Sequence, residues 1–404
     1  MVITATQAKQ LHLHHLGLWG HPSEQSALEV IDQIGHLQLD TISVVARTQD
    51  LVLHSRSTSY TEEDVWKELE HGKLFEEFAH ARSLIQMEKF PEYYWKMVHR
   101  RKDDPWWFSE IKQPEKLIEQ ALNLLDEFGE ITTSDIEIEN APKWRWGSAS
   151  KYVVDYLTTR GYAMVSRREN YTSVYYKRTE DIVDEIPDDT ELPDRLEVFW
   201  NDLERDLLQL GLTPLDRLLK YTHNNRRFEY QGKQLTPRYL IKDGLDKGRL
   251  CQVEVQDYPK PMYHHPDVDP HDIDLPNVEN PSVYLLSPFD NLLWSRKSLL
   301  QQYQFDYKFE AYTPKKKRIY GFYSLPILYG MDLVGRVDPK VDRSSAHLSF
   351  KHWHFEENFS PSTHFYDALS CTIERFIVFH KASSYDFGDL ENSHQHELEN
   401  RITI

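Results

Sequence analysis

The stretch SASKYVVDYLTTRGYAMVSRRENYTSVYYKR, residues 148–178, decides the fold. Its first half, 148–160, has apolar residues at helical spacing and is stopped by Gly161. Its second half alternates polar and apolar residues on both sides of Glu169–Asn170, which predicts a β-hairpin. Residues 115–128 predict another helix just upstream. Helix, turn, helix and hairpin is the order of a winged helix, whose second helix usually enters the major groove of DNA.

The same order of elements recurs on both sides of this stretch. Downstream, the pattern predicts helices over 196–210, 214–220 and 237–247 and a hairpin over 249–265. Upstream, it predicts helices over 5–18, over 23–37 with Ser23 as N-cap, and over 62–74. We therefore expect two copies of the module and a third, more divergent copy at the N-terminus.

The C-terminal part of the chain changes character after two acidic, proline-containing linkers, 180–194 and 264–281. Strands are predicted over 282–289, 307–314, 318–330, 331–340 and 347–355, followed by a helix over 363–383 and a polar tail. Gly330 marks a hairpin turn between two of the strands, and a small β-barrel or sandwich fits this series. The fold class is α+β, with predicted domains at 1–110, 111–190, 191–280 and 281–404.

Composition limits the possible classes of protein. The chain has 404 residues and a net charge of −18, which argues against indiscriminate binding to nucleic acid. Charge is segregated, however: residues 141–178 carry eight Lys/Arg against two Asp/Glu, and 296–318 carry seven against two. The sequence has no apolar run of transmembrane length, no signal-peptide pattern and only two cysteines. A reducing cytoplasm is the expected location, without a membrane partner.

One short motif combines an amide with a carboxylate. In HLQLD, residues 36–40, apolar and polar residues alternate, which predicts a strand with Gln38 and Asp40 on one side. Such a pair suits acid–base chemistry, but Asp40 would also make a good N-cap for a helix over 41–46, which is the commoner role. The sequence shows no phosphate-binding loop, and its histidine pairs have no second set of ligands. We therefore predict no metal or cofactor.

Three blocks carry a resemblance to a known family. They are QLDTISVVARTQDLVLHSR (38–56), FEEFAHARS (75–83) and the long block from Leu285 to Arg343. All three resemble the YcaQ/AlkZ family of alkylpurine and interstrand-crosslink DNA glycosylases. The triplet Gln38-Leu39-Asp40 matches the Gln–apolar–Asp form of the family's catalytic signature.

The resemblance implies both an architecture and an activity. It implies three winged helices followed by a β-barrel, forming a C-shaped clasp on DNA, and it assigns Gln38 and Asp40 to catalysis. The implied reaction is monofunctional cleavage of N7-alkylated purines, including N7-linked crosslinks. The expected partner is double-stranded DNA with an alkylated or crosslinked guanine, bound by a monomer in the cytoplasm and at the nucleoid.

A clasp on DNA needs basic residues spread over several modules. The candidates are Arg47, Arg56, Arg167, Arg168, Arg296, Lys316, Arg318 and Arg336. Arg167 and Arg168 rest on the predicted hairpin tip alone, and the KKKR run that contains Lys316 and Arg318 could equally be a solvated loop. His80 matches an Ala-His of the family and is expected either to line the site or to be a buried structural histidine. The hairpin around Gly330 is expected either to insert into the minor groove or to close the barrel.

A second function stays open at this point. Winged helices occur more often in regulators than in enzymes, so a non-enzymatic transcriptional regulator is the alternative. The Gln–apolar–Asp triplet within the family-like block favours the glycosylase.

Overall fold

The chain divides into two compact units in the computed structural model, which describes residues 2–79, 81–111, 113–138, 148–189, 193–215, 228–271 and 278–403. Unit 1 comprises Met1–Thr61, Glu204–Phe228 and Gln234–Ile404, and unit 2 comprises Glu62–Leu203 and Glu229–Lys233. One boundary follows Thr61, and the others fall within helix α8 (Arg195–Leu210) and the short strands β8 (Phe228–Tyr230) and β9 (Lys233–Leu235).

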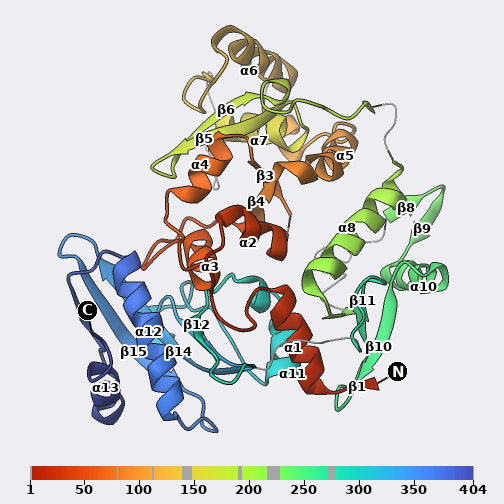
Figure 1. Cartoon of the computed structure of the whole chain (residues 1–404). Coiled ribbons are helices and arrows are strands. Elements are labelled where there is room, and N and C mark those ends of the chain that lie inside the picture. Colours follow the sequence, from red (N-terminus) through yellow and green to blue (C-terminus); the bar gives the residue numbers. More distant parts are fainter. Residues whose placement is uncertain are drawn as a thin grey trace. The chain divides into compact units, whose positions relative to one another are not determined.

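The predicted helix–helix–hairpin lies in unit 2. Its elements are α6 (Pro114–Phe128), α7 (Ala149–Thr159), β5 (Ala163–Glu169) and β6 (Ser173–Arg178), in yellow tones in Figure 1. Ser148 caps α7 by accepting the backbone N–H of Lys151 at 3.2 Å. The hairpin turns through Asn170 and Tyr171, both with positive φ, one residue later than predicted. The predicted helices and hairpin are confirmed.

The rest of unit 2 surrounds an aromatic core. Its elements are α4 (Asp64–Glu70), β3 (Leu74–Phe78), β4 (Arg82–Gln86), α5 (Phe90–Arg100) and the 3₁₀ turns Met87–Lys89, Trp106–Ser109 and Thr179–Asp181. Strands β3 and β4 pair in antiparallel register. The ring of Phe75 on β3 contacts the rings of Phe90 and Tyr93 on α5 edge to face.

Unit 1 contains a small sheet in the order β1-β10-β11-β7. Its strands are β1 (Val2–Ile3), β10 (Cys251–Val255), β11 (Met262–His264) and β7 (Thr213–Pro214), with α10 (Pro237–Lys247) preceding β10. The predicted hairpin over 249–265 and the helix over 237–247 are confirmed. The helix predicted over 214–220 falls mostly outside the described residues.

A second sheet of unit 1 has the order β12-β13-β14-β15-β16. Its strands are β12 (Val283–Leu285), β13 (Leu325–Tyr329), β14 (Asp332–Asp342), β15 (His347–Phe355) and β16 (Ser384–Asp386), and helix α12 (Thr363–Phe379) packs against it (Figure 1). Gly330, with φ +61°, makes the predicted turn between β13 and β14.

One strand predicted for the C-terminal region is wrong, and two other elements differ in extent from the prediction. Residues 307–314 form coil and turns instead of a strand; Tyr307 is buried, and its hydroxyl donates to the backbone oxygen of Ser324 at 2.6 Å. Helix α12 ends earlier than expected, at Phe379. Within the polar tail, the structure adds β16 and the helix α13 (Asn392–Glu399), which the sequence pattern did not predict.

The N-terminal segment of unit 1 supplies α1 (Ala5–His15), α2 (Ala27–Ile34), β2 (Leu37–Gln38) and α3 (Thr48–Arg56), and α11 (Arg296–Tyr303) with the 3₁₀ turn Asn291–Leu293 follows β12. Helix α2 begins three residues later than predicted. Its N-cap is Ser26, since the Ser26 hydroxyl accepts from the N–H of Glu29 while the Glu29 carboxylate accepts from that of Ser26. Ser23 is therefore not the cap.

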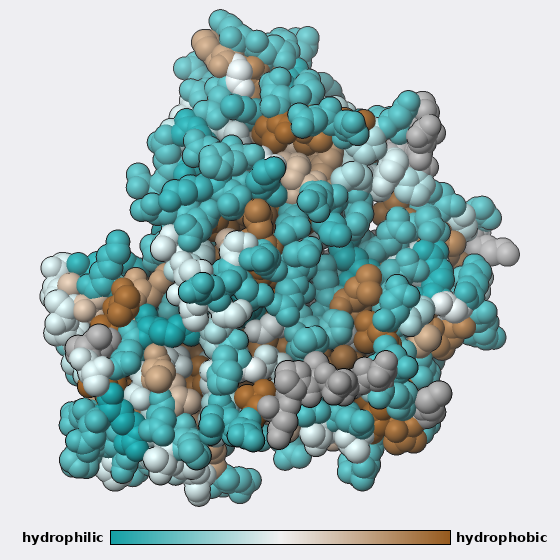
Figure 2. Space-filling model, viewed as in Figure 1, coloured by the Kyte–Doolittle hydropathy of each residue, from teal (hydrophilic) through white to brown (hydrophobic). Residues whose placement is uncertain are grey.

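Most of the surface drawn in Figure 2 is hydrophilic. Within the part of the chain that the structure describes, none of the helices has both the length and the apolar character needed to cross a membrane.

Candidate active site

The segment from Leu37 to Asp40 is anchored by two leucines. Leu37 is fully buried and Leu39 is 8% exposed, so the alternating pattern correctly predicted their burial. Gln38, between them, is also only 8% exposed. Its Oε1 has no hydrogen-bond partner among the described residues, which is unusual for a buried amide oxygen.

Asp40 is half-buried at the end of this segment. Its Oδ1 accepts the backbone N–H of Ile42 at 2.6 Å. Burial raises the pKa of Asp40, and the Ile42 N–H opposes that change only in part. The Asp40 carboxylate is therefore a stronger base than usual. This is the property expected of a group that takes up a proton during a reaction.

The alternative role of Asp40 as a helix cap is wrong. No helix forms over 41–46; the next helix is α3, and its N-cap is Arg47. The backbone oxygens of this segment instead accept hydrogen bonds from residues far along the chain. Val44 O accepts the N–H of Val341, and Val45 O accepts from the Arg343 side chain at 3.0 Å. Asp40 closes a two-residue turn rather than a helix.

The first turn of α3 lies next to Asp40, which the sequence pattern did not predict. Gln49 is completely buried, and its Oε1 lies 3.5 Å from the backbone nitrogen of Asp40. The Nε2 of Gln49 has no hydrogen-bond partner among the described residues. Gln49 lies inside the family-like block 38–56, but its own alternation pattern does not distinguish it from its neighbours.

Tyr323 also reaches this region from far along the chain. Its hydroxyl lies 3.4 Å from that of Thr48, and the Ser287 hydroxyl donates to Thr48 at 3.2 Å. Burial raises the pKa of Tyr323, and the negative charge of Asp40 raises it further. No local sequence signal pairs Tyr323 with the 38–49 segment, because only the folded sheet brings them together.

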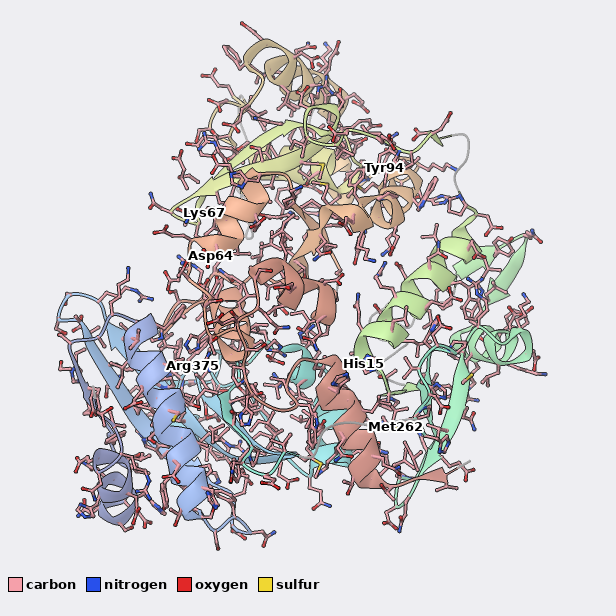
Figure 3. The ribbon with its side chains drawn as sticks, in the orientation of Figure 1. His15, Asp64, Lys67, Tyr94, Met262 and Arg375 are labelled. Atoms are coloured by element: carbon pink, nitrogen blue, oxygen red, sulfur yellow. The ribbon has the colours of Figure 1, made fainter. Side chains whose placement is uncertain are left out.

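The far end of α3 is tied to α12. Arg375, labelled in Figure 3, donates to the backbone oxygens of His54 at 2.6 Å and Ser57 at 2.9 Å. Helix α3 is therefore held at both ends, by Arg375 and by the contacts of Thr48.

Two of the expected DNA contacts are enclosed within unit 1. The Arg56 side chain has no exposed surface and donates to both carboxylate oxygens of Asp290, at 2.8 and 3.1 Å. Arg336 is 2% exposed and donates to Glu356 at 2.7 Å while stacking on Tyr320. These placements exclude both guanidinium groups from the surface that DNA could touch.

The two arginines of the unit 2 hairpin are paired with glutamates. Arg167 donates to Glu130 at 2.8 Å and also to Glu169, and these carboxylates raise the pKa of Arg167. Arg168 forms a two-pronged pair with the buried Glu76. Both arginines lie on β5 rather than in the turn, so the predicted position at the tip is wrong.

The remaining candidates differ in exposure. Arg47 and Arg296 are half-buried, and Arg296 donates to Pro288 O at 3.1 Å. Arg318 is also half-buried and donates to Thr313 O at 2.8 Å. Lys316 is exposed in the 3₁₀ turn η6 (Lys315–Lys317). His80 lies outside the described residues.

Two comparisons relate the chain to known proteins. A family model described as DNA glycosylase AlkZ-like matches residues 31–379, which is most of the chain. The fold is similar to that of the solved Streptomyces sahachiroi DNA glycosylase AlkZ, with a TM-score of 0.64 at 15% sequence identity. That alignment covers 96% of this chain and 99% of the Streptomyces chain.

Proposed function

Because the chain belongs to the AlkZ-like DNA glycosylase family and is therefore an enzyme that acts on DNA, we propose that it hydrolyses the N-glycosidic bond of N7-alkylated purines and unhooks N7-linked interstrand crosslinks. Membership in an enzyme family sets aside the regulator that the sequence left open. The observation that best supports the proposed reaction is the half-buried Asp40 with its raised pKa, two residues after the buried Gln38 and with its backbone nitrogen 3.5 Å from Gln49 Oε1.

The chemistry of the lesion suits this arrangement. An N7-alkylguanine is cationic, so it leaves with the bonding electrons without strong protonation. Positive charge then develops on the deoxyribose, and a carboxylate beside the sugar stabilises that state more than the ground state. Asp40 supplies this charge and takes a proton from the attacking water.

Gln38 has the second role in this proposal. A nucleophilic water must be held in line with the breaking bond, since misplacement is costly in rate. The Oε1 of Gln38, which has no hydrogen-bond partner in the part of the chain that the structure describes, is suited to accept a hydrogen bond from that water. A crosslinked base cannot swing freely out of the duplex, so we propose that the sugar is approached without full base flipping.

We further propose that the chain binds duplex DNA through tandem winged-helix modules within 1–110, 111–190 and 191–280, followed by a β-barrel within 281–404. Unit 2's α6–α7–β5–β6 order supports the second module. Among the basic candidates, exposure favours Lys316 as a phosphate contact, with Arg47 and Arg296 as partly exposed contributors.

The Gly330 hairpin can be tested more sharply than the sequence allowed. Leu328 is fully buried, so its removal would disturb the core rather than the hairpin's tip. Met331, adjacent to Gly330, is half-buried and is the better probe. If the hairpin inserts into the minor groove, Met331→Ala should lower cleavage of crosslinks much more than it lowers the melting temperature, because it loses only partial packing on the core.

The decisive experiment is single-turnover cleavage of two duplexes, one with a single N7-methylguanine and one with an N7-linked guanine–guanine crosslink. We expect wild type to form abasic sites and Asp40→Asn to bind DNA equally but lose cleavage by roughly 10²- to 10³-fold. Asparagine keeps an oxygen that can accept the Ile42 N–H, so the turn survives.

Asp342→Asn is the matched control, because Asp342 accepts the N–H of Ser344, two residues on, in the same kind of turn. Intact lesions after incubation with wild type would refute the proposed reaction. Equal losses in Asp40→Asn and Asp342→Asn would show that the loss does not depend on the Asp40 charge in particular.

A further inference from the structure

The loop over 311–319 carries the two most exposed large apolar side chains in the part of the chain that the structure describes. Tyr312 is 82% exposed and Ile319 is 77% exposed. Single exposed apolar residues are ordinary, but apolar side chains that are rimmed by polar ones mark interaction surfaces. The rim here is the run Lys315–Lys317, whose three side chains are all exposed. The loop therefore combines an aromatic face with positive charge.

Hydrogen bonds bring the two ends of this loop together. The backbone oxygen of Glu310 accepts the N–H of Thr313, and the Glu310 carboxylate accepts that of Ile319 at 2.9 Å. The side chain of Arg318 donates to Thr313 O at 2.8 Å. Tyr312 and Ile319 therefore lie at the two ends of one closed loop.

A second buried carboxylate fixes the chain just after the loop. Asp338 on β14 is 5% exposed and accepts the N–H groups of Phe322 and Tyr323, both at 2.8 Å. Gly321 precedes them with φ +118°, and an added Cβ there would lie 2.2 Å from an Asp338 carboxylate oxygen. The loop is therefore held in shape without DNA, so little entropy is lost when it binds.

The ring of Tyr312 is supported by other aromatic rings. Phe309 contacts Tyr312 edge to face, with ring centroids 5.9 Å apart, and contacts Tyr323 in the same way at 5.6 Å. Tyr323 is the buried residue whose pKa responds to the Asp40 charge. Two ring contacts thus connect Tyr312 to the surroundings of Asp40 within unit 1.

Lysines beside an exposed aromatic ring suit DNA in which a base has left the stack. Lysines bind phosphates of any sequence, and an aromatic ring stacks on any base whose face is uncovered. In an intact duplex the neighbouring bases cover these faces. A damaged or unpaired base costs less to unstack, so it can offer its face to a ring outside the helix.

We propose that Tyr312 stacks on an unpaired base of the DNA while Lys315–Lys317 hold the adjoining phosphates. This inference deepens the proposed function, from which it takes Lys316 as a phosphate contact. Tyr312 is then a substrate-binding residue that favours distorted duplex over intact duplex, and it takes no part in the cleavage step.

The test measures binding to two undamaged DNA probes, so it does not depend on cleavage. One probe is a fully paired duplex, and the other is the same duplex with a single bulged adenine. Tyr312→Phe keeps the aromatic ring, Tyr312→Leu keeps apolar surface without a ring, and Tyr312→Ala removes both. Tyr239→Ala is the matched control, because Tyr239 on α10 is also an exposed tyrosine, at 54%.

We expect wild type to bind the bulged duplex at least about fivefold more tightly than the paired duplex. Tyr312→Ala and Tyr312→Leu should lose this preference, with the Kd for the paired duplex changed less than about twofold. Tyr312→Phe and Tyr239→Ala should keep the preference. The slope of log K against log salt on the paired duplex should be unchanged in Tyr312→Ala, because that variant loses no cation.

Four results would overturn the inference. Equal affinity of wild type for the two probes would show that the protein does not select an unpaired base. A preserved preference in Tyr312→Leu would show that no stacking is involved, and a loss of preference in Tyr239→Ala would show that Tyr312 has no special role. A smaller salt slope in Tyr312→Ala would show that Tyr312 only positions the lysines. By contrast, intact N7-alkylated duplexes after incubation with wild type would refute the proposed reaction and leave these binding results unaffected.

Discussion

Arg56 and Asp290 form an ion pair that is completely enclosed in unit 1. The Arg56 guanidinium also donates to Leu16 O at 2.7 Å, and the Asp290 carboxylate accepts the N–H of Leu292 at 3.0 Å. The pair therefore connects α3, the loop after α1 and the turn before α11 at one point. Such a pair holds a structure in register more than it adds net stability.

Breaking that pair on one side should be costly. We expect Arg56→Met to lower the free energy of unfolding by about 3–5 kcal/mol, because Asp290 is left buried without its cation. Adding Asp290→Asn removes the stranded charge and should recover part of the loss. Urea denaturation of the three proteins measures both effects. Full stability together with weakened DNA binding would instead show that Arg56 contacts DNA.

The titration of Asp40 gives a second prediction for a single residue. Burial raises the pKa of Asp40 above its ordinary 3.8, and the proposed mechanism needs the ionised form. The rate should be full above the raised pKa and fall about tenfold per unit of pH below it. Single-turnover rates across pH, corrected for cleavage without enzyme, check this. A flat profile down to the ordinary pKa of an aspartate would contradict it.

At the scale of an element, the loop over 311–319, here called the lysine loop, is held by hydrogen bonds among its own and adjacent residues. The carboxylate of Glu310 is 3% exposed and accepts the N–H groups of Ile319 and Tyr320 at 2.9 and 2.8 Å. Arg318 closes the loop by donating to Thr313 O. The loop thus presents Lys315–Lys317 on a fixed frame, beside Tyr312 at 82% exposure.

The lysine loop should contribute to general affinity for DNA. We expect the triple variant Lys315→Ala/Lys316→Ala/Lys317→Ala to weaken binding to undamaged duplex. The slope of log K against log salt should fall by about 1 for each lysine that no longer neutralises a phosphate. Titrations at several salt concentrations measure this. A triple alanine variant of the exposed Lys340, Lys351 and Lys381 makes the same change in net charge and should keep most of the slope. Equal reductions of the slope in the two variants would show that only net charge matters, and not the position of the lysines.

At the scale of the whole molecule, local patterns predicted the elements whose residues pack on near neighbours. The α6–α7 helices and the β5–β6 hairpin follow from periodicity and turn residues, and the structure confirms them. The helix expected over 41–46 fails because Val45 packs into the core of the five-stranded sheet with Tyr323. The sequence did not predict the pairing of Arg56 with Asp290 for the same reason, because the two residues are far apart in the chain. The Gln–apolar–Asp triplet identified the candidate site, whereas Gln49 needed the folded structure.

The stability of the whole molecule should depend on pH through two buried histidines. Burial lowers the pKa of His54 and of His380 to about 3, and each packs against the ring of Phe379. Arg375 and His380 also oppose a charge on His54. The unfolded chain takes up these protons below its ordinary pKa of 6.5, whereas the folded chain does not, so stability is lost as pH falls from about 6.5 towards 3.

Each of these histidines should contribute a slope of about 1.4 kcal/mol per unit of pH below that point. Denaturation at pH 5 to 7 is expected to give a shallower pH dependence for His54→Phe than for wild type. Replacement of the exposed His364 should leave the dependence unchanged. Parallel curves for wild type and His54→Phe would show that His54 is protonated in the fold.

The division of unit 1 into three sequence segments has a consequence for synthesis on the ribosome. Strand β1, at residues 2–3, pairs in parallel with β10, so this pairing cannot form until residue 255 has left the ribosome. The region around Asp40 forms later still, because it includes Tyr323, whose pKa responds to the Asp40 charge. The long middle segment, Glu62–Leu203, emerges without interruption and can bury its own aromatic core in the meantime. The proposed catalytic site around Asp40 is then among the last parts to form, so an incomplete nascent chain lacks the finished site.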